Sequence, residues 1–185
     1  MACFSLDRVG RSWSVFDAEK LHWVNAQILH HATGDRLAAW GESVLPEEAR
    51  ALEPARLQAL LAAVRGNLGT LADLPGELAP FLREPLAFEP EAAAALGSPR
   101  AAEICGTLAA QLAELAEWNG ERVKSAVQTV GRSTGLKGRD LFQPVRAALT
   151  GRTHGPELPR VAELLGRDRC VARLRAAAGV AGRIP

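Results

Sequence analysis

The segment 137–166, KGRDLFQPVRAALTGRTHGPELPRVAELLG, holds the residues whose types and spacing could do chemistry. Arginines, glycines and prolines interrupt its short apolar runs, which is typical of short helices that meet end to end with basic side chains at their junctions. An arginine guanidinium can bond the edge of a base bidentately and can stack on its face. Glycine allows a ligand to approach the backbone closely. Residues of these types are therefore suited to contacts with the bases of single-stranded RNA.

Arg146 is the strongest single candidate in this segment. The sequence predicts a short helix that begins at Pro144 and ends at Gly151, because proline suits a helix start and glycine a helix end. Apolar residues of that helix are expected to face inward, which would turn Arg146 outward toward a ligand. The alternative is a surface arginine that bonds a helix C-terminus.

The nine residues 150–158, TGRTHGPEL, form the second candidate site. Pro156 is expected to begin a helix, whose free N–H groups would favour an anion or a base edge. Arg152 and His154 would add donors and a stacking surface beside Gly155. The alternative is an ordinary turn between two helices.

Charge is distributed unevenly along the chain. Residues 1–118 contain 9 Lys+Arg and 16 Asp+Glu, whereas residues 119–185 contain 13 Lys+Arg and 5 Asp+Glu, so a net charge of −7 precedes one of +8. The basic part indicates an anionic partner, although well-solvated arginine-rich helices explain it equally on charge alone. Lys137, Arg139 and Arg160 are the expected phosphate contacts. The arginines of the last predicted helix are expected to form a solvated face: Arg167, Arg169, Arg173 and Arg175.

The elements that position these residues are all predicted to be helices, because alanine and leucine dominate and no alternating strand pattern appears. Pro54 is expected to break the second helix, and Asn119-Gly120 is the expected boundary between two consecutive bundles. Asp17 and Ser98 are the expected N-caps of the helices that begin at residues 18 and 99. The expected helices are 18–31, 46–65, 70–74, 75–82, 99–118, 121–134, 144–150, 156–166 and 168–178.

Other classes of function have little support in the sequence. The three cysteines are odd in number and far apart, so reduced thiols in a cytoplasmic protein are expected rather than disulfides or a zinc site. His30 and His31 have no partners that would complete a metal site. We find no membrane span and no secretory signal. No catalytic residue, metal or cofactor is predicted, and DNA is not an expected partner.

Two groups of residues give the chain a family resemblance. Asp140-Leu141-Phe142, Pro144, Arg146–Gly151 and Gly155–Leu158 stand in the order found in the anticodon-binding domain of bacterial-type glutamyl-tRNA synthetases. Near the other end, Phe4–Val9, Val15–Asp17, Glu19–Leu21, Trp23 and Asn25 resemble the stem-contact segment that leads into the same domain. Of these residues, Trp23 is expected to pack in the core. The resemblance covers nearly the whole chain, although residues 34–118 match mostly in helical character.

The resemblance implies an all-α fold with a stem-contact remnant at 1–33, a first anticodon-binding bundle at 34–118 and a second, basic bundle at 119–185. It implies that Arg146, Gly155, Pro156 and Leu158 contact anticodon bases. In discriminating members an arginine before the run equivalent to Thr70-Leu71 also reads an anticodon base. Asn67 stands at that position here, and Arg65 lies two residues earlier.

The resemblance also implies that tRNA is the partner, with glutamate tRNA as the expected one. The chain has neither the HIGH-type nor the KMSKR-type motif of the catalytic domain, so ATP and Mg²⁺ are expected only on a separate catalytic domain. Met1-Ala2-Cys3 directly before Phe4 suggests a truncated chain. Three hypotheses stay open: a part of a glutamate–tRNA ligase, a free-standing tRNA-binding paralogue with a regulatory role, and a helical protein-interaction module.

Overall fold

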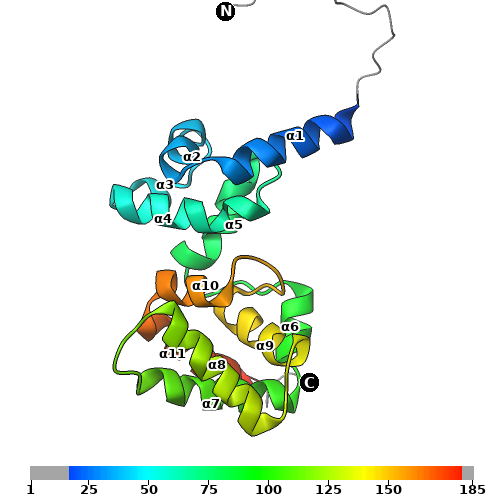
Figure 1. The fold of residues 1–185 in the computed structure, drawn as a ribbon, viewed down its shortest axis with the longest axis vertical. Coiled ribbons are helices and arrows are strands. Elements are labelled where there is room, and N and C mark those ends of the chain that lie inside the picture. Colours follow the sequence, from blue (N-terminus) through cyan, green and yellow to red (C-terminus); the bar gives the residue numbers. More distant parts are fainter. Residues whose placement is uncertain (1–16, 181–185) are drawn as a thin grey trace, which may run out of the picture.

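The computed structural model describes residues 17–180, which fold into eleven α-helices and two short 3₁₀ turns with no strand among them (Figure 1). The all-α expectation is therefore confirmed. The stem-contact match at Phe4–Val9 and at Val15-Phe16 lies outside the described residues. The helices form two lobes, which we call the N-terminal lobe (residues 17–82) and the C-terminal lobe (residues 90–180).

The N-terminal lobe packs five helices and both 3₁₀ turns. Helix α2 packs along α4, and α1 packs against the turn η2. Gly34 makes the first contact possible, because a Cβ there would lie 2.5 Å from the carbonyl oxygen of Gln58. The elements are α1 (Ala18–His31), α2 (Gly34–Trp40), α3 (Glu47–Arg50), α4 (Pro54–Val64), η2 (Arg65–Asn67), η3 (Leu71–Asp73) and α5 (Leu74–Leu82).

The C-terminal lobe contains six helices, and four of them pack around the long pair formed by α7 and α11. Helix α6 lies on α9, and α10 lies on α8. The connector 83–89 joins the two lobes and packs onto the end of α9, where the Glu89 N–H donates to the Gly151 carbonyl at 2.8 Å. The helices are α6 (Pro90–Leu96), α7 (Pro99–Ala113), α8 (Gly120–Thr134), α9 (Arg139–Thr150), α10 (Leu158–Leu165) and α11 (Arg167–Val180).

The division between the lobes differs from the boundary predicted after residue 118. Helix α7 was expected in the first bundle, but it packs against α8, α9 and α11 of the C-terminal lobe. Its buried residues Ile104, Leu108 and Leu112 form the apolar face that these helices cover. The charge changes sign near residue 119, but packing follows the apolar faces, and these place the division in the connector 83–89.

Local sequence signals fix several helix ends as predicted. The Asp17 carboxylate accepts from the Lys20 N–H at 3.0 Å, and the Ser98 hydroxyl accepts from the Ala101 N–H at 3.1 Å. These side chains satisfy backbone donors that lack partners in the first helical turn. Pro54 begins α4 after a break, as expected. Asn119 caps α8 through its bond to the Arg122 N–H at 2.9 Å.

Two predicted helix starts near the candidate site are wrong. Helix α9 begins at Arg139 rather than at Pro144, which lies inside the helix. Helix α10 begins at Leu158 rather than at Pro156, so the turn 151–157 is longer than expected. Proline is tolerated at a helix start, but packing of the buried Leu141 and Pro144 holds α9 together through its proline.

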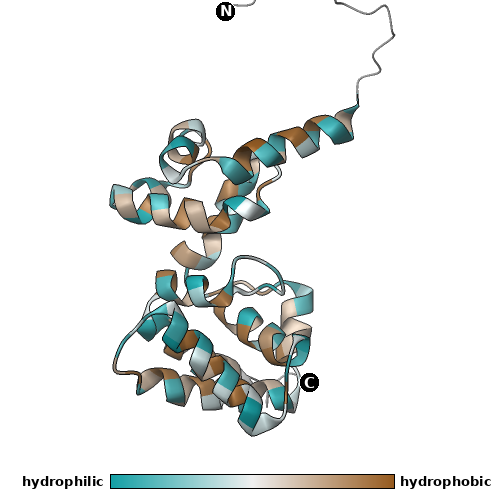
Figure 2. Ribbon diagram, in the orientation of Figure 1, coloured by the Kyte–Doolittle hydropathy of each residue, from teal (hydrophilic) through white to brown (hydrophobic). Residues whose placement is uncertain are grey.

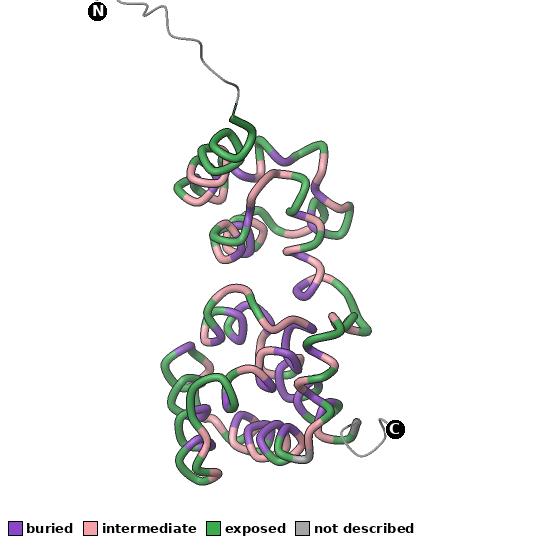
Figure 3. The backbone as a smooth tube through the Cα atoms, turned by 90° about the vertical axis from the view of Figure 1, so that its right-hand side faces the viewer, coloured by how far each residue is buried: buried purple, intermediate pink, exposed green. Residues whose placement is uncertain are grey.

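Buried apolar side chains of both lobes belong to one contiguous core. Figure 3 shows that buried residues lie in each lobe. Cys105 and Cys170 belong to this core, and burial raises the pKa of both thiols to about 12. One expectation fails on α1, where apolar and polar residues alternate along the ribbon (Figure 2). Trp23 was expected in the core but is 62% exposed, because α1 contacts the lobe only through its other face.

Arginine side chains hold the lobes together. Arg173 is buried and donates to the Leu149 carbonyl of its own lobe, to the Pro80 carbonyl at 2.8 Å and to the Glu84 carboxylate at 2.7 Å. Arg169 donates to the Phe81 carbonyl at 2.7 Å. The expected solvated face of the last helix is thus wrong for these two residues. The basic C-terminal charge is used in part to bind the N-terminal lobe and the connector.

Candidate nucleic-acid interface

A groove of about 570 Å³ lies where the two lobes meet, and we call it the inter-lobe groove. A volume of this size falls within the range of ligand sites in proteins. Its walls come from α4 and η2 on one side and from the turn before α10 on the other. The lining residues are His30, Ala62, Ala63, Arg65, Gly66, Asn67, Gly155, Pro156, Glu157 and Arg160.

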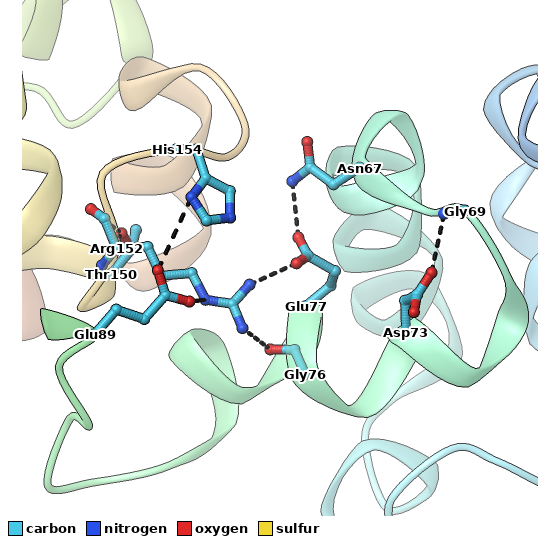
Figure 4. Close-up of polar contacts among 9 residues, drawn as sticks. All are labelled: Asn67, Gly69, Asp73, Gly76, Glu77, Glu89, Thr150, Arg152 and His154. Carbon is cyan, nitrogen blue, oxygen red and sulfur yellow. Dashed lines mark hydrogen bonds and ion pairs between the residues drawn. The ribbon is translucent and has the colours of Figure 1, made fainter. Parts of the chain in front are cut away.

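Asn67 lies at the end of η2, and its orientation is fixed by Glu77. The Asn67 Nδ2 group donates to the Glu77 Oε2 atom at 2.7 Å. A carboxylate only accepts hydrogen bonds, so this bond assigns the amide and directs the Asn67 Oδ1 atom away from Glu77 (Figure 4). Asn67 is exposed and lines the groove, where Oδ1 can accept a bond from a ligand.

Arg65 also lines the groove but is partly used within the protein. Its Nη1 group donates to the carbonyl of Ala32, the C-cap residue of α1, at 3.0 Å. Asn25 and His30 tie α1 to the same turn, because they bond the carbonyls of Gly69 at 2.6 Å and of Leu68 at 3.0 Å. The turn that carries Asn67 is therefore held from behind by α1.

Gly155 and Pro156 form the opposite wall, and Arg146 supports them. The Arg146 Nη1 group donates to the Pro156 carbonyl at 2.5 Å. Gly155 has a φ of +130°, and a Cβ there would lie 3.6 Å from Arg146 Nη1 and 3.8 Å from Asn67 Nδ2. These distances bring Arg146, Gly155 and Asn67 together, although 78 residues and more separate Asn67 from the others in sequence.

The expectation that Arg146 faces outward is only partly met, because the residue is half-buried behind the turn. Burial lowers the pKa of its guanidinium from the ordinary value of 12.5. Arginine stays charged in proteins even so. The bond to Pro156 uses one of five N–H donors on a guanidinium. Arg146 can therefore hold the turn and also present charge to a ligand in the groove.

The last two residues of this part of the site differ from each other. Arg160 is exposed on the first turn of α10, lines the groove and pairs with Glu163 at 3.0 Å. Leu158 is 5% exposed and belongs to the core. The expected contact of Leu158 with a base is therefore wrong for its side chain, which packs inward where α10 begins.

Arg152 and His154 lie on the same turn but face the N-terminal lobe and the connector (Figure 4). Arg152 pairs with Glu77 at 2.5 Å and with Glu89 at 3.2 Å, and it donates to the Gly76 carbonyl at 3.0 Å. The His154 Nδ1 atom lies 3.9 Å from Glu89. The N–H donors of Arg152, which were expected to bind RNA, are thus bonded to groups of the protein itself.

Lys137 and Arg139 are not among the residues that line the inter-lobe groove. Lys137 lines a separate surface hollow with Arg132 and Phe142, beside the loop between α8 and α9. Arg139 is exposed and donates to Gln143 on its own helix at 3.0 Å. Sequence reasoning grouped all basic residues of 137–160 together, whereas α9 separates this loop from the turn 151–157.

Glu77 and Glu89 are the residues that sequence reasoning missed. They lie in the acidic part of the chain, and they bind Arg152 from α5 and from the connector. No local motif marks them. The one signal in the sequence was the opposite charge of the two halves, which pairs carboxylates of one part with arginines of the other.

Fold and site together define an all-helical binding module whose groove lies between two lobes. Residues 29–178 match a protein family that is described as "Anticodon binding domain". The match covers most of the chain, so the chain belongs to this family of anticodon-binding domains.

Glutamate–tRNA ligases are among the most similar curated proteins. The ligase of Exiguobacterium sibiricum is 34% identical over 179 residues, and that of Bacillus subtilis is 33% identical over 181 residues. These alignments cover 94% and 93% of this chain but only 37% of each relative. The chain thus spans somewhat more than a third of the length of the relatives it matches.

A solved structure shows the same fold. The crystal structure of a glutamate tRNA ligase from Elizabethkingia meningosepticum superposes with a TM-score of 0.80 at 22% identity, covering 95% of this chain and 35% of that one. Within residues 17–180, no helix combines the length and the apolar character needed to cross a membrane.

Proposed function

We propose that the inter-lobe groove binds the anticodon loop of a tRNA, and that this tRNA is glutamate tRNA. One observation carries the proposal: residues 65–67 of one lobe and residues 155–157 with Arg160 of the other line a single groove, with Arg146 directly behind it. The family match supports tRNA as the ligand class. The glutamate–tRNA ligases among the relatives support glutamate tRNA as the particular tRNA.

Unstacked bases are the part of the loop that suits this groove. Sequence-specific proteins read RNA mostly in loops, where bases splay out and expose their edges. The Asn67 Oδ1 atom would accept from a base amino group, and Arg160 and Arg146 would attract the backbone or donate to a base. The glycine and proline of the opposite wall let the backbone approach closely.

This module would contribute tRNA recognition to glutamate–tRNA ligation in translation, a cytoplasmic process. ATP, Mg²⁺ and the chemistry of ligation would belong to a catalytic domain with which it works. A role as a free-standing tRNA-binding regulator uses the same groove. A protein-interaction module would not need it, so RNA affinity separates that alternative from the other two.

Discrimination between anticodons would rest on Asn67. The Asn67 carboxamide brings no charge. In discriminating members of the family, the resemblance places an arginine at this position. The orientation of Asn67 toward Glu77 leaves an acceptor for the ligand, so we propose a preference for bases that present an amino group.

Binding of a labelled anticodon stem-loop RNA, followed by fluorescence anisotropy, tests the proposal. We expect Asn67→Ala and Arg160→Ala to weaken binding about 5- to 30-fold each, the range for loss of one hydrogen bond that involves a base or a charge. Arg122→Ala is the matched control, because Arg122 is exposed on α8 and pairs with Glu117 at 3.7 Å. Equal affinity of all four proteins would contradict the proposal.

A further inference from the structure

Arg152 lies beside the inter-lobe groove, and its surroundings do not suit a phosphate. Its guanidinium meets two carboxylates and a carbonyl, and the Arg152 side chain is only 20% exposed. One arginine and two glutamates leave this cluster with a net charge of −1. An RNA backbone would be repelled by it rather than attracted.

The same contacts connect Arg152 to the groove. Glu77 accepts from Arg152 through Oε1 and from Asn67 through Oε2 (Figure 4). One carboxylate thus joins an arginine of the C-terminal lobe to the asparagine of the N-terminal lobe that lines the groove. Glu77 is itself well covered, with a side chain 13% exposed, so water screens its bond to Arg152 only weakly.

Arg152 also fixes the opposite wall. It follows Gly151, whose carbonyl binds the connector, and it precedes the turn that carries Gly155. The bonds to Glu77 and Gly76 set the spacing between this turn and α5. Both walls of the groove therefore depend on one side chain that lies outside its lining.

We propose that Arg152 is a positioning residue for RNA recognition: through Glu77 it orients the Asn67 carboxamide and sets the distance between the two walls of the groove. This inference rests on the proposed function of the groove. It assigns Arg152 a role different from the direct RNA contact that its place in a basic turn suggests.

The effect of salt on affinity distinguishes the two roles. A residue that contacts a phosphate releases counterions, so its loss lowers the slope of log affinity against log salt by about 0.7–0.9. We expect Arg152→Ala to weaken binding of the anticodon stem-loop RNA about 5- to 30-fold with an unchanged slope. A slope lowered by that amount would overturn the positioning role.

For Glu77→Gln, simple electrostatics and a positioning role predict opposite changes in RNA affinity. The substitution removes a negative charge, and simple electrostatics predicts tighter RNA binding from it. A positioning role predicts weaker binding, because the neutral amide has one acceptor oxygen in place of two and cannot hold both Arg152 and Asn67 as the carboxylate does. Glu42→Gln, at an exposed site of the same lobe, is the matched control for charge. Tighter binding by both variants would overturn the inference.

A measurement without RNA keeps failure of this inference distinct from failure of the proposed function. We expect Arg152→Ala to speed amide hydrogen exchange of residues 65–70 in the free protein, while exchange in α7 and α11 stays slow. Unchanged exchange at 65–70 would overturn the positioning role. Faster exchange together with no RNA affinity of the native chain would keep the coupling but refute its purpose in RNA recognition.

Discussion

Three arginines of the C-terminal lobe show how one residue type serves different ends. Arg173 is buried and bonds carbonyls of both lobes, Arg152 bridges two carboxylates, and Arg146 supports the Gly155–Pro156 turn. All three lie in the basic C-terminal part of the sequence, where Arg146 and Arg152 were expected to meet RNA and Arg173 was expected on a solvated face. Their partners lie 10 to 93 residues away, so no local pattern could separate them.

The prediction for Arg146 belongs at this scale. We expect Arg146→Ala to weaken binding of the anticodon stem-loop by about 10- to 100-fold, because a charge-assisted hydrogen bond and the support of the turn are both lost. The helical circular dichroism signal should stay intact. Unchanged affinity in the anisotropy assay would remove Arg146 from the site.

Gly151 is a second residue with a defined requirement. Its φ is +73°, and a Cβ there would lie 2.0 Å from the Ala87 carbonyl oxygen. We expect Gly151→Ala to lower the free energy of unfolding in urea by about 2–4 kcal/mol, from backbone strain and from the clash with the connector. Gly66→Ala is the control, since nothing lies within 4 Å of a Cβ there. A loss no greater than that of the control would refute this requirement.

At the scale of elements, helix positions followed from the sequence wherever the signal was local. Caps at Asp17 and Ser98 and the break at Pro54 were all predictable, because each acts within one helical turn. Helix α2 was not predicted, and the start of α9 was placed five residues late. Both depend on packing: α2 lies against α4, and a Cβ at Gly34 would clash with the Gln58 carbonyl oxygen.

Glu163 connects two elements and makes their contact sensitive to pH. It accepts from Arg160 and from the Gly120 N–H at the start of α8, and these bonds lower its pKa from the ordinary value of 4.5. Since the folded pKa is below the unfolded one, the stabilisation is present above the unfolded pKa and is lost as the pH falls through the folded pKa.

We therefore expect Glu163→Gln to reduce the dependence of unfolding free energy on pH in the acid range, with both proteins measured in urea from about pH 3 to pH 6. The native protein should lose more stability than the variant as the pH falls below the ordinary carboxyl pKa. Parallel curves would show that Glu163 contributes nothing to the acid sensitivity.

At the scale of the whole molecule, the charge asymmetry has a structural explanation that the sequence did not show. Arg152, Arg169 and Arg173 bind acceptors of the N-terminal lobe and the connector. The sequence predicted an all-α protein and five of the ten residues that line the groove, namely Arg65, Asn67, Gly155, Pro156 and Arg160. It could not show which cations are used inside, since that depends on how the lobes dock.

Removal of the central arginine tests this docking. We expect Arg173→Met to lower the unfolding free energy by about 3 kcal/mol, because Glu84 and two buried carbonyls lose their donor. Arg175→Met on the exposed face of α11 is the matched control and should change little. Equal stability of the two variants in urea would contradict the role given to Arg173.

The most direct test of the central claim compares labelled glutamate tRNA with a copy altered only in its anticodon, by fluorescence anisotropy at two salt concentrations. The groove between the lobes predicts salt-dependent binding that falls when the anticodon is changed. Binding that ignores the anticodon, or no binding at either salt concentration, would contradict an anticodon-reading function for this protein.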